Sequence, residues 1–409
     1  MRASRFVSDE EYGVNRRFSA LKGAIIHDDF GRNLIDFSNA DGAVFIGHND
    51  AELNNALIKH LESGCFTGGY IGEAFDQVTA EISSVFSIGS DETLVNYFAS
   101  GTAALRSVVS ALRSITGNKL ILSCGYHGWD EAWSPAEGLL SANAHGVIDF
   151  YFEMELFWAA LDKFGDAIGS VVFSPDFLYH RQHTFIEIAR VASARGMIVV
   201  CDDVYWGLRT CYGPSIPPCA GIDAYVVSKC LSNGHRLAAL AGRKMLVEAT
   251  RGDLSTSQCS EMPFVATGVV LNRLKDGLER YKGLAARGDV FVETVGDLLR
   301  EAGCTVRGNG SAFVFCFGNN VQEKKFYDTS YDRGLLFEVG WVQSTSLAFE
   351  SSVFDEAENR IAEVSHKLGN GDPPSLRDEF QLAWREIHGL PLIGKFSDRI
   401  AYLELLLSG

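Results

Sequence analysis

The sequence predicts an α/β protein built on a mostly parallel sheet that helices cover on both faces. Between residues 95 and 227, short apolar runs typical of buried strands alternate with longer runs whose apolar residues repeat every three or four positions, as they do in helices. Strands and helices that alternate in this way are joined by crossovers, and crossovers make neighbouring strands parallel. Several strands also end in polar or glycine-containing turns, where open α/β sheets bind ligands.

Within this region the expected elements follow a regular order. The predicted helices cover residues 103–113 and 183–194, and the first of them carries an apolar stripe. The predicted strands cover residues 95–98, 120–122, 170–173, 197–201 and 223–227. The run Met197–Cys201 is rich in β-branched residues, which favours a strand over a helix.

The segment before residue 95 predicts elements of another kind. A hairpin over residues 23–37 has its turn at Asp28–Gly31, and a loop covers residues 40–46. A helix that opens at residues 48–50 carries an apolar stripe from Leu53 to Leu61, and a second helix covers residues 73–86. Between these helices, the glycine-rich stretch 64–72 reads as a surface or active-site loop.

The segment after residue 227 predicts a second, α+β domain. Residues 265–302 read as helical with breaks at Gly268, Gly277 and Gly288, and strands at 311–317 and 335–339 precede a helix at 355–368. Residues 369–374 resemble a linker, and the remaining tail reads as mostly helical. We expect residues 1–50 and 286–409 to form this smaller domain and residues 51–285 to form the large one.

Composition narrows the classes of function. The chain has 409 residues, of which 46% are hydrophobic and 22% charged, as in a soluble globular protein of two domains. A net charge of −16 argues against nucleic acid or an anionic membrane as the main partner. No run approaches the roughly 20 apolar residues of a membrane span, and the amino terminus has no apolar core of a signal peptide.

The nine cysteines are scattered without a CxxC pair, and their number is odd. This pattern predicts reduced thiols in a cytoplasmic protein, with neither a disulfide framework nor a metal site. We expect the cysteines to fill positions in or near the core.

Four strand ends carry residues with chemical potential. Ser100-Gly101-Thr102 lies at a strand-to-helix turn, where free N–H groups and two hydroxyls can bind an anion such as a phosphate. An ordinary helix cap explains the same residues equally well. Tyr126-His127 follows the next strand, where an aromatic ring can stack on a flat heterocycle, although both side chains could also belong to the core.

The other two ends carry charges. Asp202-Asp203 closes the strand 197–201, and alternation along a strand points the two carboxylates in opposite directions. One can then face a ligand while the other makes structural hydrogen bonds. Lys229 follows the strand 223–227, where its amine either reaches solvent or serves as a Schiff-base nucleophile.

Taken together, these residues resemble the class III, fold-type I pyridoxal phosphate-dependent aminotransferases, most of all the glutamate-1-semialdehyde aminomutase branch. The matching motifs are Ser100-Gly101-Thr102-Ala103-Ala104, Tyr126-His127-Gly128, Asp202-Asp203-Val204, Gly207-Leu208-Arg209, Ser228-Lys229 and Ala241-Gly242-Arg243. The amino-terminal hairpin and Gly47-His48 match as well, so that the resemblance covers roughly residues 23–368. It implies a seven-stranded, mostly parallel sheet and a homodimer with its site at the interface.

The resemblance also implies a role for each site residue. Lys229 forms the Schiff base with pyridoxal 5′-phosphate and moves a proton, and Asp202 pairs with the pyridine nitrogen. Tyr126 and Val204 pack on the two ring faces, with His127 beside them. Ser100, Gly101 and Thr102 hold the phosphate, and a hydroxyl within 255–257 of the partner subunit, which we assign to Thr256, adds a contact.

The family resemblance leaves the reaction open between several outcomes. The first is transfer of an amino group from an amino donor to a keto or aldehyde substrate in a specialised biosynthetic pathway. The second is an intramolecular aminomutase, and the others are a racemase, a decarboxylase or an inactive binding relative. A nucleotide-binding protein with Asp202 on a ribose is a poorer fit, because no GxGxxG follows the first predicted strand.

Departures from the family pattern concern the substrate. Asp203 stands where the family has glutamate, Trp129 replaces a histidine, and Cys230-Leu231-Ser232-Asn233-Gly234 replaces a glycine-rich run. The arginine that binds the substrate carboxylate has no clear counterpart. Arg16, Arg17 and Arg181 are the candidates, and surface solvation is the alternative for each of them.

Overall fold

A computed structural model describes residues 18–64, 72–89, 92–134, 136, 140–251 and 260–375. The chain divides into two compact units. One comprises the described residues up to Ala51 and from Glu279 onward, and the other comprises those from Glu52 to Leu278.

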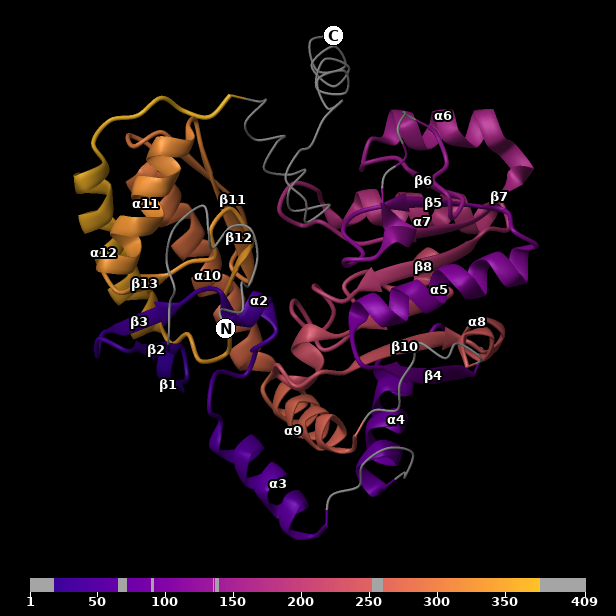
Figure 1. The fold of residues 1–409 in the computed structure, drawn as a ribbon, viewed down its shortest axis with the longest axis horizontal. Coiled ribbons are helices and arrows are strands. Elements are labelled where there is room, and N and C mark those ends of the chain that lie inside the picture. The colour runs from indigo at the N-terminus through magenta and orange to yellow at the C-terminus, as the bar shows by residue number, and fades with distance from the viewer. Residues whose placement is uncertain are drawn as a thin grey trace, which may run out of the picture. The chain divides into compact units, whose positions relative to one another are not determined.

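A seven-stranded sheet forms the centre of the Glu52–Leu278 unit (Figure 1). Its strands lie in the order β4 (Thr93–Phe98), β10 (Ala238–Arg243), β9 (Ala224–Val227), β8 (Ile198–Asp203), β7 (Ile168–Phe173), β5 (Leu120–Cys124) and β6 (Val147–Asp149). From β9 to β6 every neighbouring pair is parallel, and only β10 runs antiparallel to both of its neighbours. The predicted mostly parallel sheet is confirmed.

The same unit also contains helices, several of which contact the strands of this sheet. They are most of α3 (Ala51–Glu62), α4 (Glu73–Val85), α5 (Gly101–Thr116), α6 (Met154–Phe164), α7 (Gln182–Ala194), α8 (Lys244–Thr250) and α9 (Met262–Asp276), with short 3₁₀ turns at Glu131–Trp133, Gly165–Ala167, Pro218–Ala220 and Lys229–Ser232. The apolar stripe predicted for α5 is fully buried, from Ala104 to Leu112, against strands of the sheet. Because this stripe fixes α5 along the sheet, it also fixes where the amino terminus of α5 opens.

The other unit holds two smaller sheets. Strands β1 (Phe18–Lys22), β2 (Ile25–Asp28), β3 (Asn33–Asp36) and β13 (Leu335–Leu336) form one, and β11 (Cys304–Asn309), β12 (Ala312–Phe317) and β14 (Gln343–Ser344) form the other. The helices are α2 (Asn39–Gly42), α10 (Leu278–Leu299), α11 (Asn320–Asp332) and α12 (Ser351–Leu368). Phe37 lies at the centre of the core, where its ring meets four other phenylalanine rings at 5.0–5.8 Å.

Several expected elements differ in the structure. Of the three glycines predicted to break the helix over residues 265–302, only Gly277 separates two helices, while Gly268 and Gly288 lie inside α9 and α10. Gly288 is needed for packing instead, because a side chain there would overlap the backbone of Gly310. The strand expected at 335–339 is shortened to two residues, and Leu61 of the predicted apolar stripe is 57% exposed.

Other elements escape prediction altogether, namely β1, β6, β10, β11, β14, α6, α8 and α11. The segment expected to be a glycine-containing loop at 40–46 has a defined backbone conformation at its start. Asn39, Ala40 and Asp41 all adopt positive φ angles, so that the chain makes a left-handed turn there.

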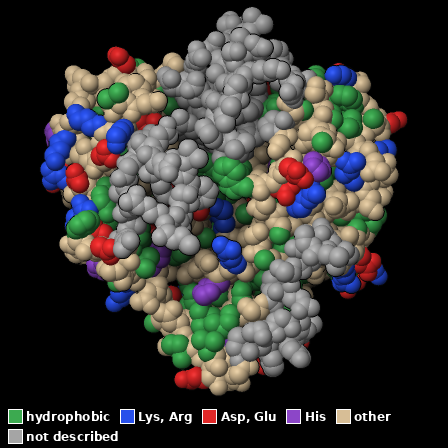
Figure 2. Space-filling view, in the orientation of Figure 1, with side chains coloured by type: hydrophobic (Ala, Val, Ile, Leu, Met, Phe, Trp, Pro, Cys, Tyr) green, Lys and Arg blue, Asp and Glu red, His purple; other side chains and the backbone are tan. Residues whose placement is uncertain are grey.

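Cysteine burial follows the expectation only in part. Cys124, Cys201, Cys230, Cys304 and Cys316 are buried, but Cys211 and Cys219 are exposed, because both lie in the loops that connect β8 to β9. Cys65 and Cys259 lie outside the described residues. None of the described helices combines the length and apolar character needed to cross a membrane. Figure 2 shows acidic and basic side chains interspersed on the visible face.

Candidate active site

The amino terminus of α5 has the features of an anion-binding turn. Ser100 has an extended backbone, and its hydroxyl accepts a hydrogen bond from the N–H of Ala103 at 3.2 Å, while its carbonyl accepts from Ala104. The N–H groups of Gly101 and Thr102 come before these and have no acceptor within the helix. The helix dipole adds positive potential at the same place. The structure shows the helix cap at Ser100, and the free N–H groups of the same turn leave anion binding there as a prediction.

Two glycines bring the ends of three strands into contact around this turn. A side chain at Gly101 would meet Val204 Cγ2 at 2.7 Å, so that α5 begins directly against the residue after β8. A side chain at Gly128 would overlap the Thr102 hydroxyl, and Gly128 has a φ of +90°. The loop after β5 and the end of β8 thus close on the α5 turn from different sides.

Asp202, at the end of β8, is held by His127. The Nδ1 atom of His127 lies 2.7 Å from the Asp202 Oδ2 atom, and both side chains are about 1% exposed. The N–H of Val204 donates to the Asp202 Oδ1 atom at 3.2 Å. The imidazole packs on the Trp133 ring at 4.3 Å, and its Nε2 atom is buried without a hydrogen-bond partner among the described residues.

Asp203 points away from Asp202, as alternation along the strand predicts. Its carboxylate accepts hydrogen bonds from the Ser215 N–H at 2.8 Å and from the Ser215 hydroxyl at 2.5 Å. Complete burial raises the pKa of Asp203 to about 7, against the opposing effect of these hydrogen bonds. Asp203 therefore fixes the loop that contains Ser215, while Asp202 is the carboxylate beside the α5 turn.

Lys229 begins a 3₁₀ turn directly after Ser228 and β9. It has a φ of 39°, a left-handed conformation that is uncommon for lysine. Strand β9 pairs with β8 so that Val227 lies opposite Asp203, which brings Lys229 to the edge where Asp202 ends. The Lys229 Nζ atom lies 5.2 Å from the centre of the Tyr205 ring, and the lysine is half-buried.

Tyr126 lies in the loop between β5 and Gly128 and is partly buried. Its ring meets Trp129 edge-on at 6.1 Å, and Trp129 is 51% exposed. The structure thus brings together the predicted residues Ser100, Gly101, Thr102, Tyr126, His127, Asp202, Val204 and Lys229 at the carboxyl edge of one sheet.

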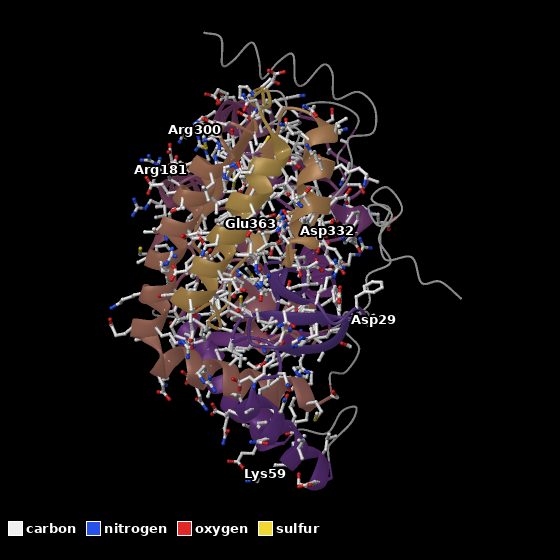
Figure 3. The ribbon with its side chains drawn as sticks, turned by 90° about the vertical axis from the view of Figure 1, so that its left-hand side faces the viewer. Asp29, Lys59, Arg181, Arg300, Asp332 and Glu363 are labelled. Carbon is white, nitrogen blue, oxygen red and sulfur yellow. The ribbon has the colours of Figure 1, made fainter. Side chains whose placement is uncertain are left out.

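Some predicted contributors lie elsewhere or outside the described residues. Thr256, Arg16 and Arg17 belong to stretches that the structure does not describe. Arg181 is exposed at the start of α7 (Figure 3), in keeping with surface solvation.

Sequence reasoning also missed several residues of this edge, among them Tyr205, Trp133 and Ser215. The sequence offered one signal for Tyr205, namely that it lies only two positions after Asp203. No spacing marks Trp133 or Ser215, because they arrive from loops.

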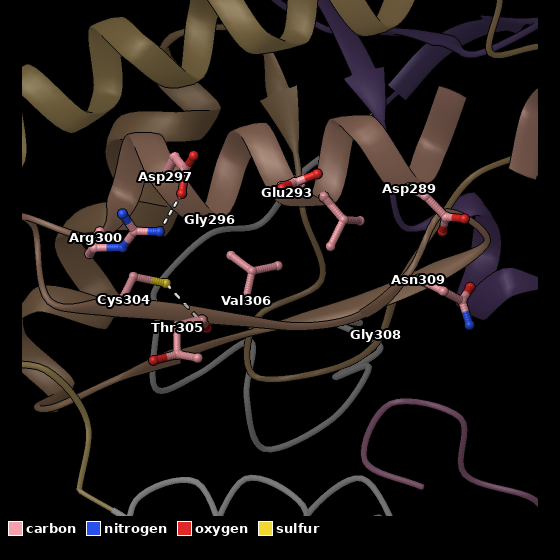
Figure 4. Close-up of a pocket in the computed structure, with 11 residues that line it drawn as sticks. Asp289, Glu293, Gly296, Asp297, Arg300, Cys304, Thr305, Val306, Gly308 and Asn309 are labelled. Atoms are coloured by element: carbon pink, nitrogen blue, oxygen red, sulfur yellow. Dashed lines mark hydrogen bonds and ion pairs between the residues drawn. The ribbon is translucent and has the colours of Figure 1, made fainter. Parts of the chain in front are cut away.

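Two surface hollows lie away from these strand ends. One, of about 490 Å³, lies between α10 and β11 and is lined by exposed acidic residues such as Glu293 and Asp297 (Figure 4). Its Asp297 is paired with Arg300. The other, of about 680 Å³, lies at the opposite edge of the large sheet, where Lys119, Arg195 and Met197 precede or begin strands. Neither contains any of the predicted site residues.

Comparisons with known proteins point to one family. No family model matches the chain. The chain is 28% identical over 303 residues to 2′-deamino-2′-hydroxyneamine transaminase of Streptomyces kanamyceticus, covering 72% of this chain and 75% of that protein. It is 24% identical to glutamate-1-semialdehyde 2,1-aminomutase of Syntrophus aciditrophicus (strain SB), covering 88% and 93%. These relatives are class III aminotransferases and aminomutases, consistent with the family that the sequence motifs resemble.

Comparison with solved structures agrees on the fold. It superposes on an omega-transaminase from Sphaerobacter thermophilus with a TM-score of 0.73 at 18% identity, covering 86% of this chain and 91% of the other. The architecture is that of the fold-type I transferases, whose cofactor is pyridoxal 5′-phosphate. The residues present fit this cofactor, because the α5 turn suits its phosphate and the buried Asp202 suits a protonated ring nitrogen.

Proposed function

We propose that this class III enzyme is an aminotransferase that moves an amino group from an amino donor to a keto or aldehyde substrate through the amine form of its cofactor. One observation carries the proposal. An anion turn, a buried carboxylate with its histidine, a partly buried tyrosine and a lysine converge at the carboxyl edge of one sheet. These groups match the parts of pyridoxal phosphate in kind, and they have no other shared purpose.

The α5 turn and β8 would hold the cofactor. Gly101 and Thr102 offer N–H groups and a hydroxyl to the phosphate, and Ser100 shapes the turn through its cap. Val204 packs against Gly101 and would cover one face of the pyridine ring, and Tyr126 would cover the other. When bound, pyridoxal phosphate supplies an aldehyde that captures amines and a ring that accepts electrons.

Asp202 and Lys229 would perform the proton chemistry. Asp202 keeps a proton on the ring nitrogen, and His127 keeps the Asp202 carboxylate oriented through its 2.7 Å hydrogen bond. Lys229 would hold the cofactor through its amine, and the same amine would serve as the general base and acid that moves a proton.

A homodimer with the site at its interface completes the proposal. In this arrangement Thr256 of the partner subunit would add a phosphate contact. Light scattering should then give twice the mass of one chain, and a monomer that retains the cofactor would contradict the assignment of Thr256.

The direct test is Lys229→Ala, with Lys244→Ala as the matched control because Lys244 is a surface lysine near Glu248. The purified wild-type protein should absorb near about 420 nm, and borohydride should attach the cofactor to Lys229 irreversibly. The Lys229 variant should lose the trapped adduct completely, and the Lys244 variant should keep it. A colourless wild-type protein, or an adduct that survives in the Lys229 variant, would refute the assignment.

A second reaction deserves the same assay, because relatives such as the Syntrophus enzyme are aminomutases. With a simple amino donor in a single turnover, an aminotransferase releases a keto acid and leaves the cofactor in its amine form. An aminomutase instead moves the amino group within one substrate. The Streptomyces relative is named for a hydroxyneamine substrate, which supports a place in a specialised biosynthetic pathway and the first of these reactions.

A further inference from the structure

Tyr205 stands out because two cations approach its ring. The Lys229 Nζ atom lies 5.2 Å from the ring centre, and the Arg209 guanidinium carbon lies 4.6 Å from it. Both distances fall within the roughly 6 Å over which a cation is attracted to an aromatic face. No motif of the sequence singles out Tyr205, and a tyrosine there could simply fill space.

The backbone of the loop around Tyr205 is more constrained than a residue that only fills space would require. The Gly207 N–H donates to the Asp203 carbonyl at 2.9 Å, and a side chain at Gly207 would meet that same carbonyl oxygen at 2.7 Å. Leu208 has a φ of 62°, which is strained for a leucine. The segment after β8 therefore turns back on itself at the cost of backbone strain at Leu208.

Arg209 and Trp206 fix the tyrosine itself within this loop. The Arg209 Nε–H donates to the Tyr205 carbonyl at 3.1 Å, and Arg209 is only 2% exposed. The Trp206 ring is buried and meets the Tyr205 ring edge-on at 5.3 Å. The buried Arg209 guanidinium binds the Tyr205 carbonyl and also lies against the ring. These contacts leave the ring little freedom to turn.

The electrostatic consequence concerns the Lys229 amine. Arg209 and Lys229 act on the same surroundings, since both lower the pKa of the neighbouring Cys230 thiol, whereas burial, the larger effect, raises it. Two like charges near one another favour loss of a proton from the lysine, because the guanidinium cannot lose its own. An electron-rich ring face in contact with both cations opposes that loss. Further ionisable groups among the described residues of this edge include the carboxyl groups of Asp202 and Asp203 at the end of β8, His127 on Asp202, and Tyr126.

We propose that Tyr205 is a positioning residue for Lys229, whose ring face holds the amine in place and stabilises its protonated form beside the buried charge of Arg209. This inference rests on the proposed function, in which Lys229 is the amine that binds the cofactor. It adds that the residue two positions after Asp203 sets how readily this amine gives up its proton.

The test measures the amine without the cofactor. Full-length, cofactor-free protein is treated with acetic anhydride over about pH 7 to 11, and acetylation of Lys229 is quantified by peptide mass spectrometry. Tyr205→Leu removes the ring, so the pH midpoint of Lys229 labelling should fall by roughly 0.4 to 1.5 pH units. Tyr205→Phe keeps the ring and should restore the wild-type midpoint.

Tyr212→Leu is the matched control. Tyr212 lies in the same loop, but its hydroxyl donates to Glu81, and its loss should leave the midpoint unchanged. An unshifted midpoint in Tyr205→Leu, or an equal shift in Tyr205→Phe, would overturn the proposal. Borohydride trapping on Lys229 stays a separate measurement, so that failure of the proposed function can be told apart from failure of this one.

Discussion

Asp202 illustrates how single contacts keep a charged group inside the sheet unit. A carboxylate buried to this degree is costly unless donors surround it, and here two of them come from different elements. The Val204 N–H comes from the chain just beyond β8, and His127 comes from the loop after β5. Because Trp133 packs on the imidazole, the ring is held in the orientation that points Nδ1 at the carboxylate.

His127→Leu should therefore destabilise the cofactor-free protein. It removes one partner of a buried charged pair and leaves the other without it, which typically costs about 3–5 kcal/mol. The free energy of unfolding in urea should fall by that order. His127→Gln offers an amide donor and should recover part of the loss.

His145→Leu serves as the control, because His145 lies 3.8 Å from the exposed Glu131 at the surface. Its effect should stay within about 0.5 kcal/mol. Equal losses in the two leucine variants would show that the Asp202–His127 hydrogen bond carries no special stability.

Backbone conformation at single residues also marks this edge. Lys229, Asn233 and Leu208 all have positive φ angles, which cost non-glycine residues free energy. Such strain persists only where surrounding structure imposes it, and the three residues lie at Lys229 or in the loops that follow β8 and β9. The sequence gives no sign of it, since lysine and leucine ordinarily occupy helices and strands.

At the scale of elements, the joint between α5 and β8 depends on the absence of one methyl group. Gly101→Ala would place a Cβ atom 2.7 Å from Val204 Cγ2, well inside ordinary contact. Overpacking of this kind typically costs about 1–3 kcal/mol. We expect Gly101→Ala to lower the free energy of unfolding by that amount and to weaken cofactor binding, because the anion turn shifts.

Val204→Ala should relieve the clash. In a double-mutant cycle, Gly101→Ala should cost less in the Val204→Ala background than in the wild type, with a coupling of about 0.5–3 kcal/mol. Additive effects in urea unfolding would mean that the two side chains do not meet. Gly283→Ala is the control for the glycine substitution, because there is open space around Gly283. Gly196→Ala is unsuitable, because the φ of 72° at Gly196 would strain an alanine.

Elements with strong periodicity were predictable, and those defined by long-range pairing were not. The apolar stripe of α5 and the β-branched run of β8 are visible in the local sequence. The predicted bounds of both elements lie within a few residues of the observed ones. Strand β10 reads as a small-residue run, Ala238–Arg243, and becomes a strand only because β4 and β9 offer it partners on both sides. Gly268 and Gly288 were predicted to break the helix because glycine has a low helix propensity. In the structure both helices continue through them, because packing overrides this propensity.

The same distinction applies to the site. Residues at strand ends, such as Asp202 and Lys229, were predictable because parallel strands bring their carboxyl ends to one edge. Trp133 and Tyr205 were not, because a short 3₁₀ turn and a tight loop place them, and no spacing rule encodes either.

For the whole molecule, two deeply buried carboxyl groups should shape the dependence of stability on pH. Burial raises the pKa of both Asp176 and Asp203 to about 7. Asp176 follows β7, where its Oδ1 atom accepts a hydrogen bond from the Leu178 N–H at 2.9 Å. Its Oδ2 atom is buried without a hydrogen-bond partner among the described residues. The protonated form is therefore the one that the folded state favours.

The sign of the pH effect follows from linkage. Between the usual aspartate pKa of 3.8 and about 7, the folded protein binds more protons than the unfolded chain, so that stability is greatest at the acid end of this window and falls as the pH rises through it. The loss per group is at most about 4 kcal/mol. Asp176→Asn is neutral throughout and keeps the oxygen that accepts from Leu178. The variant should lose less stability than the wild type between about pH 5 and 8 in urea unfolding. Asp166→Asn, on the exposed turn before β7, should retain the wild-type slope. If Asp176→Asn retains it too, the Asp176 carboxyl is already ionised at acid pH and its buried oxygen has found a donor.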